Sequence, residues 1–123
     1  MNQKIILIVD DHAELRKLVR MTLKCDDYEL HEAKNGQRAL ELAKLIKPDL
    51  VILDVMMPGE IDGFQVCNNL KQDGSEKIPY VMLLTAKKQM TDFKDGIRAG
   101  ADNYLTKPFS PSELIDSVQS ALA

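Results

Sequence analysis

Polar side chains that can do chemistry follow four short apolar runs of the sequence. Asp10 and Asp11 follow the first run, Asp54 the second and Thr85 the third, and Lys107 comes two residues after the fourth. Apolar runs of this length are typical of buried strands in a parallel sheet. Ligands bind such sheets beyond the carboxyl ends of the strands. We therefore expect the five side chains to converge on one site.

The charges of this group indicate a divalent cation. Asp10, Asp11 and Asp54 together carry about −3, which would destabilise the fold if it were left uncompensated. Lys107 contributes about +1, and a bound Mg²⁺ would bring the local sum to about zero. Mg²⁺ prefers carboxylate and phosphate oxygens, and a site this poor in nitrogen ligands indicates magnesium or manganese rather than zinc.

A carboxylate held beside such an ion can attack phosphorus, as in enzymes that form an aspartyl phosphate. The cation and Lys107 would take up charge on the phosphoryl oxygens, and the hydroxyl of Thr85 can donate to one of them. Phosphorylation of Asp54 would change the local charge from about zero to about −1, an event that can draw a hydroxyl and its loop inward. The residues thus predict a phosphorylation switch.

The elements that must position these residues follow from the apolar pattern. Five strands are predicted, over residues 5–9, 28–33, 50–53, 80–84 and 103–105. Between and after them, five segments carry helically spaced apolar stripes: Leu15, Leu18, Val19 and Leu23; Ala39, Leu40, Ala43 and Ile46; Val66, Cys67 and Leu70; Met90, Phe93 and Ile97; Leu114, Ile115, Val118 and Leu122. Pro48 should end the second helix, and Ser110, Pro111 and Glu113 form a capping box at the start of the last. The alternation predicts an open α/β sandwich, a parallel sheet covered on both faces by five helices.

Length, charge and cysteine usage limit the remaining possibilities. The chain of 123 residues suits one domain over residues 1–123, and 16 basic against 19 acidic residues give a net charge of −3. That charge argues against direct nucleic-acid or membrane binding. Cys25 and Cys67 lack metal-ligand or CxxC spacing, and the first apolar run is too short for a signal peptide or a membrane span. We expect reduced thiols and a cytoplasmic protein.

Four segments of the sequence resemble the receiver domain of two-component response regulators. They are IVDDH at residues 8–12, ILDVMMPG at 52–59, LLTA at 83–86 and GADNYLTKPF at 100–109. The resemblance covers essentially the whole chain. It implies a flavodoxin-like, doubly wound sheet with strand order 2-1-3-4-5. It also implies that Asp54 is the phosphoacceptor, which takes its phosphoryl group from a phosphohistidine on a sensor histidine kinase or a phosphotransfer protein.

The same resemblance assigns the metal ligands. Asp10 and Asp11 would hold Mg²⁺ directly or through water, together with Asp54 and the backbone carbonyl of Met56. His12, like His31, is interpreted as an exposed or half-buried side chain without a role in the site.

The resemblance also assigns the switch. Thr85 and Lys107 would contact the phosphoryl group, and Tyr104 matches the aromatic residue that swings inward when the threonine moves. The Lys107–Pro108 bond matches one that is often cis in the family. Phosphorylation would alter the surface of the fourth helix, fifth strand and fifth helix, and so control an unknown output partner; a homodimer through this surface is a further expectation.

The sequence departs from the family at one loop, and two further positions flank the site. The stretch from Pro58 to Gly63 looks one residue longer than the common spacing between Pro-Gly and Asp-Gly, which concerns the loop after Asp54 rather than the acceptor. Met56 and Lys87 stand where the family tunes dephosphorylation.

Other interpretations of the same residues stay open at this point. Asp10 and Asp11 could cap the first helix, and Tyr104 could be an ordinary packed aromatic. A Mg²⁺-dependent phosphatase or phosphotransferase is an alternative function, although Asp54-Val55-Met56 lacks the second aspartate of a DxD motif. A flavodoxin-like cofactor module is another, although no glycine-rich phosphate loop follows the first strand.

Overall fold

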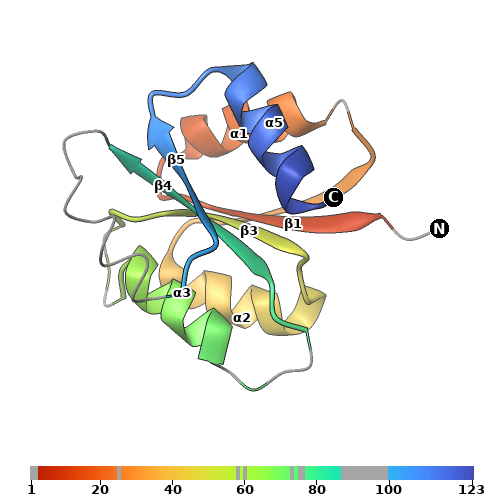
Figure 1. Cartoon of the computed structure of the whole chain (residues 1–123). Helices are drawn as coiled ribbons and strands as arrows, with labels where there is room; N and C mark the ends of the chain where they lie inside the picture. Colours follow the sequence, from red (N-terminus) through yellow and green to blue (C-terminus); the bar gives the residue numbers. More distant parts are fainter. Residues whose placement is uncertain are drawn as a thin grey trace.

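The computed structural model describes residues 3–24, 26–57, 59, 61–72, 74, 77–86 and 100–123. The elements along the chain are β1 (Lys4–Val9), α1 (Ala13–Leu23), β2 (Tyr28–Ala33), α2 (Gly36–Ile46), β3 (Leu50–Asp54), α3 (Gly63–Gln72), β4 (Tyr80–Ala86), β5 (Asn103–Lys107) and α5 (Pro111–Ala121) (Figure 1). The five predicted strands and four of the five predicted helices are confirmed. The helix predicted around Met90, Phe93 and Ile97 lies outside the described residues, as do Cys25 and Lys87.

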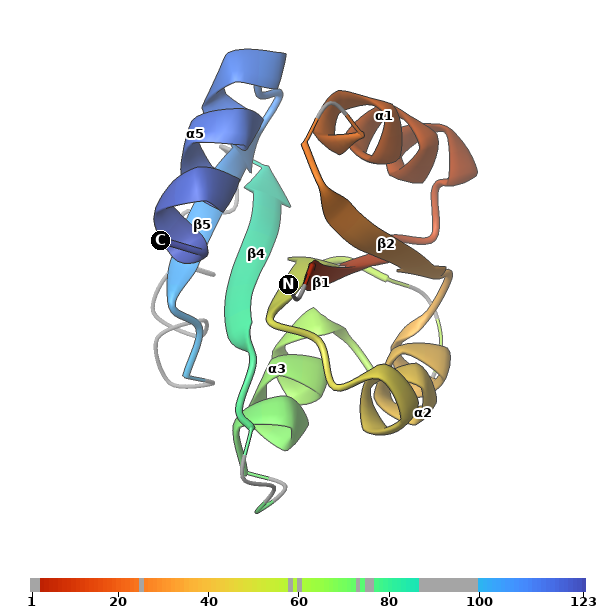
Figure 2. The same ribbon diagram turned by 90° about the vertical axis from the view of Figure 1, so that its right-hand side faces the viewer.

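The five strands form one parallel sheet of order β2-β1-β3-β4-β5, as the family resemblance implied. Helices α1 and α5 cover one face of this sheet, and α2 and α3 cover the other (Figure 2). The central strand β3 is buried along its whole length. Its continuous apolar run is what a parallel strand covered on both faces requires.

Two apolar layers, one on each face, form the core. Successive strand residues point to opposite faces, so each strand contributes to both layers. The layer under α2 and α3 includes the strand residues Leu7, Val9, Val51, Leu53, Val81 and Leu83. The layer under α1 and α5 includes Ile6, Ile8, Leu50, Ile52, Met82 and Leu84. A residue's position in its strand therefore decides which pair of helices it faces.

The predicted helix stripes are confirmed in α2, α3 and α5, whereas one residue of the α1 stripe is wrong. Val19 and Leu23 are buried, but the side chain of Leu18 is 51% exposed. Helix α1 packs along a narrow line of residues four apart, from Leu15 through Val19 to Leu23, and Leu18 is rotated about 100° from that line. The part of the chain that the structure describes contains no helix long and apolar enough to cross a bilayer.

The helix ends follow the predicted signals. The N–H of Glu113 donates to Ser110 Oγ over 3.2 Å and the N–H of Ser110 donates to Glu113 Oε1 over 3.1 Å, so the capping box at α5 is confirmed. Helix α2 ends at Ile46, two residues before Pro48. The Lys107–Pro108 peptide bond is cis, as the resemblance implied.

Two aspartates organise the amino ends of the strands. Asp49 Oδ2 accepts a hydrogen bond from the N–H of Ile5 over 2.7 Å, and Asp102 Oδ2 accepts one from the N–H of Val81 over 2.8 Å. Lys77 Nζ lies 3.0 Å from Asp49 Oδ1. Burial alone would raise the pKa of Asp49, but the Ile5 N–H and the Lys77 ammonium outweigh it and lower that pKa below its ordinary value. These carboxylates satisfy N–H groups that begin the sheet.

Candidate functional site

At the carboxyl edge of the sheet, Asp54, Thr85 and Lys107 lie on strand backbone, whereas Asp10 and Asp11 come directly after the end of β1. Asp54 is the last residue of β3. Strands β4 and β5 run two residues further than predicted, to Ala86 and Lys107, so that β4 includes Thr85. The strands extend because their ladder continues, pairing Thr85 with Thr106 and Ala86 with Lys107. Regular strand backbone holds a side chain's direction more tightly than a loop does.

Two buried carboxylates share one lysine at this edge. Asp10 is 1% exposed and Asp54 is 3% exposed. Lys107 Nζ lies 3.1 Å from Asp54 Oδ1 and 3.5 Å from Asp10 Oδ2. One ammonium cannot balance two carboxylates, and buried charge that lacks a partner is costly. The pair therefore favours a further cation.

The electrostatics of Asp54 support the same conclusion. Burial raises the pKa of Asp54, and the neighbouring Asp10 carboxylate raises it further. The Lys107 ammonium and the N–H of Met56, 3.4 Å from Asp54 Oδ1, offset only part of that increase. The surroundings of Asp54 therefore disfavour its ionised form, and binding of either a proton or a metal ion would offset the negative charge.

Asp11 supplies a carboxylate oxygen that could bind a cation. Its Oδ1 is buried and accepts no hydrogen bond within the described part of the chain, although the Nδ1 of His12 lies 3.2 Å away. The ligand atoms of Asp10, Asp11, His12 and Asp54 lie within 4.8 Å of one another. Three carboxylates whose oxygens converge in this way fit a hard divalent cation such as Mg²⁺ or Mn²⁺.

His12 is the site residue that sequence reasoning missed. Its side chain is 69% exposed, yet Nδ1 lies 3.1 Å from Asp10 Oδ1 and 3.2 Å from Asp11 Oδ1. The N–H of His12 also donates to Asp10 Oδ1 over 2.8 Å. His12 is itself the N-cap residue of α1, which has no side-chain cap, so the interpretation of Asp10 and Asp11 as helix caps is wrong. Its place directly after the aspartate pair was the available signal.

Thr85 and Tyr104 share the face of the sheet that α2 and α3 cover. Tyr104 pairs with Leu83 across the β4–β5 ladder and packs against the α2/α3 layer, and burial raises the pKa of its phenol. Thr85 lies two residues after Leu83, which places it on the same face. Its hydroxyl is 3.5 Å from the Ala86 carbonyl oxygen, a weak contact. The ladder and the packing together bring the two predicted switch residues to neighbouring positions.

The loop after Asp54 returns closely to the end of β3. The N–H of Gly63 donates to the carbonyl of Val55 over 3.1 Å, which closes the loop where α3 begins. A Cβ on Gly63 would lie 2.3 Å from the Asp54 carbonyl oxygen. Only glycine permits this approach. The predicted extra residue falls in this loop, where Pro58 and Glu60 lie outside the described residues.

The sequence and fold comparisons agree with this architecture. The model of the response regulator receiver domain family matches residues 6–119. The chain is 43% identical over 117 residues to the transcriptional regulatory protein SrrA of Staphylococcus aureus, a match that covers 95% of this chain and 47% of SrrA. The chain thus spans about half the length of the curated relatives it matches.

Two solved structures resemble the fold closely. The chemotaxis response regulator CheY4 of Vibrio cholerae superposes with a TM-score of 0.89 at 30% identity, covering 98% of this chain and 99% of CheY4. The receiver domain of NtrX from Brucella abortus gives a TM-score of 0.86 at 30% identity, covering 95% and 97%. With its family match, its sheet order and its acidic carboxyl edge, the chain belongs to the receiver domains of two-component response regulators.

Proposed function

We propose that this receiver domain is a phosphorylation switch in which Asp54 accepts a phosphoryl group from a phosphohistidine. The donor would be a sensor histidine kinase or a phosphotransfer protein. The observation that carries the proposal is the position of Lys107 Nζ between the buried carboxylates of Asp54 and Asp10. In this arrangement Asp54 is a nucleophile with a fixed cation beside it, at an edge of the sheet where a ligand can approach.

Asp10, Asp11 and Asp54, together with the backbone carbonyl of Met56, are the proposed ligands of Mg²⁺, with Mn²⁺ as a substitute. The ion, when bound, supplies positive charge against both the carboxylates and the phosphoryl oxygens. The convergence of these carboxylate oxygens and the raised pKa of Asp54 support this ligand set.

The protein's own residues then position the phosphoryl group and neutralise the charge on its oxygens. A carboxylate oxygen of Asp54 attacks phosphorus as the bond from phosphorus to the imidazole nitrogen breaks. Lys107, which pairs with the carboxylates in the free protein, turns to a phosphoryl oxygen. Thr85 donates its hydroxyl to another phosphoryl oxygen, and its weak contact with the Ala86 carbonyl costs little to give up.

The switch would pass from Thr85 to Tyr104, because both lie on the α2/α3 face of adjacent strands. A shift of Tyr104 would change the surface around β5 and α5, where an output partner or a second copy of the domain would bind. We propose residues 1–123 as the unit that carries the switch, acting in the cytoplasm.

Incubating the protein with Mg²⁺ and a small acyl phosphate is expected to add the mass of one phosphoryl group. The added group should be absent in Asp54→Asn, because the amide is a poor nucleophile, and absent when a chelator removes the metal. Intact-mass spectrometry measures all three. Asp116→Asn, at an exposed position of α5, is the matched control and should label like the wild type. Equal labelling of Asp54→Asn would rule out Asp54 as the acceptor.

A further inference from the structure

Arg16 reaches from α1 to the backbone of Asp10, which with Asp11 supplies two of the three proposed metal-site aspartates. Its Nη1 donates to the carbonyl oxygen of Asp10 over 2.5 Å. On the other side of the same residue, the N–H of Asp10 donates to the carbonyl of Ala33 over 3.2 Å. Asp10 follows the last residue of β1, so these two bonds hold its backbone in place beyond the end of the strand. The carbonyl of Asp10 belongs to the peptide that joins Asp10 to Asp11.

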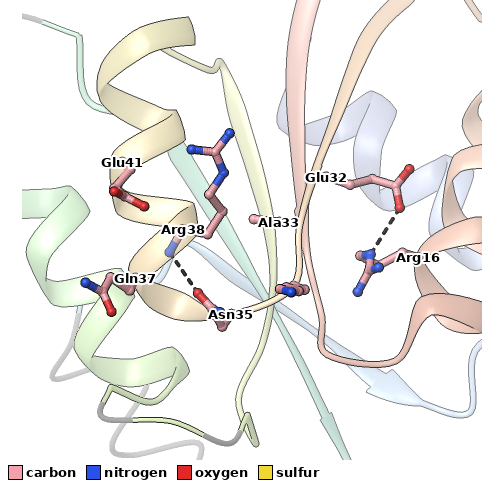
Figure 3. Close-up of a pocket in the computed structure, with 8 residues that line it drawn as sticks. Arg16, Glu32, Ala33, Asn35, Gln37, Arg38 and Glu41 are labelled. Carbon is pink, nitrogen blue, oxygen red and sulfur yellow. Dashed lines mark hydrogen bonds and ion pairs between the residues drawn. The ribbon is translucent and has the colours of Figure 1, made fainter.

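A second contact fixes the direction of the Arg16 guanidinium. Arg16 Nε donates to Glu32 Oε1 over 3.1 Å, at the wall of a surface pocket of about 480 Å³ between α1 and α2 (Figure 3). The side chain of Arg16 is only 16% exposed. Arg20 Nη1 pairs with the other oxygen, Glu32 Oε2, over 3.2 Å, but its remaining contact is with the Leu30 carbonyl, away from the site.

We propose that Arg16 is a positioning residue for the metal site, acting through the Asp10–Asp11 peptide. A guanidinium can donate in two directions at once, so it can hold the Asp10 carbonyl while Glu32 orients it. Rotation of that peptide would turn both carboxylates away from the shared centre. Groups that orient metal ligands typically change metal affinity about 10–100-fold when they are removed. The inference rests on the proposed function, in which Asp10 and Asp11 bind Mg²⁺.

The two arginines on Glu32 provide a matched pair of variants. Arg16→Met is expected to weaken Mg²⁺ binding about tenfold or more, whereas Arg20→Met, which also loses an ion pair with Glu32, should leave the affinity close to that of the wild type. Titration with Mg²⁺ alone, followed by the backbone amide resonances of ¹⁵N-labelled protein, measures the affinity. The Asp11 amide lies in the peptide that Arg16 holds, so its resonance should also move in metal-free Arg16→Met and stay in metal-free Arg20→Met.

If Arg16 served only to stabilise the packing of α1 on β2 through Glu32, the variants would behave differently. Both variants would then lose thermal stability while keeping the wild-type Mg²⁺ affinity, and that result would overturn the inference. If Arg16→Met does not fold, Arg16→Lys replaces it and Arg20→Lys replaces its control. The lysine at position 16 cannot hold the Asp10 carbonyl and Glu32 together, and is expected to weaken Mg²⁺ binding relative to that control. Equal affinities in this pair would also overturn the inference. A wild type whose resonances do not respond to Mg²⁺ would instead overturn the proposed metal site itself.

Discussion

Lys107→Met is expected to lose about 2 kcal/mol of unfolding free energy at neutral pH, somewhat less than the roughly 3–5 kcal/mol typical of breaking a fully buried ion pair. The loss arises because Asp10 and Asp54 are buried and keep their mutual repulsion without the ammonium between them. The expected loss is smaller than for a fully buried pair because the Lys107 side chain is 27% exposed, and solvent weakens its ion pairs. Urea unfolding of the two proteins gives the difference.

The pH and metal dependence of this loss distinguish it from lost packing. Without Lys107, the pKa of Asp54 rises further above its unfolded value, because the ammonium is one of the groups that lower it. A raised pKa favours the folded state at low pH and ceases to do so as the pH rises through the folded value. The deficit of Lys107→Met should therefore shrink as the pH falls, and Mg²⁺ should reduce it at neutral pH.

Lys77→Met is the matched control for this prediction. It removes a lysine from Asp49 at the opposite edge of the sheet, where the Lys77 side chain is 45% exposed. An ion pair of this exposure is worth about 0–1 kcal/mol. If Lys107→Met loses no more stability than Lys77→Met, or if its deficit is the same at all pH values and Mg²⁺ concentrations, the electrostatic account of the site is wrong.

Gly63→Ala is expected to destabilise the protein by about 2–3 kcal/mol, in the range for overpacking a close contact. The three atoms nearest to the new Cβ would all be backbone, among them the Asp54 carbonyl oxygen at 2.3 Å and Val55 Cα at 2.8 Å. Relief requires either α3 or the end of β3 to move. Movement of β3 would displace Asp54, and small misplacements of a reacting group can cost about 100-fold in rate. Urea unfolding and the rate of phosphoryl labelling measure the two effects.

Gly36→Ala tests whether this effect belongs to the site. Gly36 begins α2 as Gly63 begins α3, and its added Cβ would also be crowded, at 2.7 Å from Val66 Cγ2 and 2.8 Å from Ile61 Cγ1. Those neighbours are side chains, which can adjust. Gly36→Ala should therefore lose less stability and label at close to the wild-type rate. Similar labelling by both alanine variants would show that the Asp54 backbone tolerates the crowding at Gly63.

The sequence predicted the sheet and the convergence of its site because both depend on local signals. Strands covered on two faces must be continuously apolar, as Leu50 to Leu53 are, and parallel strands bring their carboxyl ends to one edge. The order of the strands in the sheet, in contrast, could not be derived from local signals. Alternation of strands and helices required a parallel sheet, but only the resemblance to a known family supplied the order 2-1-3-4-5.

What could not be predicted depends on distant packing. Leu18 fits the apolar spacing of α1, and its exposure follows from the narrow line along which α1 packs. The contact between Arg16 and the Asp10 carbonyl depends on how α1 sits against β1 and β2, which no local pattern encodes. The turn of His12 toward the aspartates likewise depends on a side-chain conformation that residue type leaves open.

Asp49, at the amino ends of the strands, and Asp54, at the carboxyl edge, give the sheet two ends that respond to acid in opposite ways. Asp49 has a lowered pKa, so its contribution to stability is present above the ordinary aspartate range and is lost only as the pH falls through its folded value. Asp54 has a raised pKa, so mild acid protonates it and removes its repulsion with Asp10 before Asp49 begins to protonate. Acidification from neutral pH should first stabilise the carboxyl edge of the sheet, at Asp54, and then destabilise the amino edge, at Asp49. A divalent cation at Asp54 would replace the proton there, so that acid denaturation of the loaded domain begins without the initial gain.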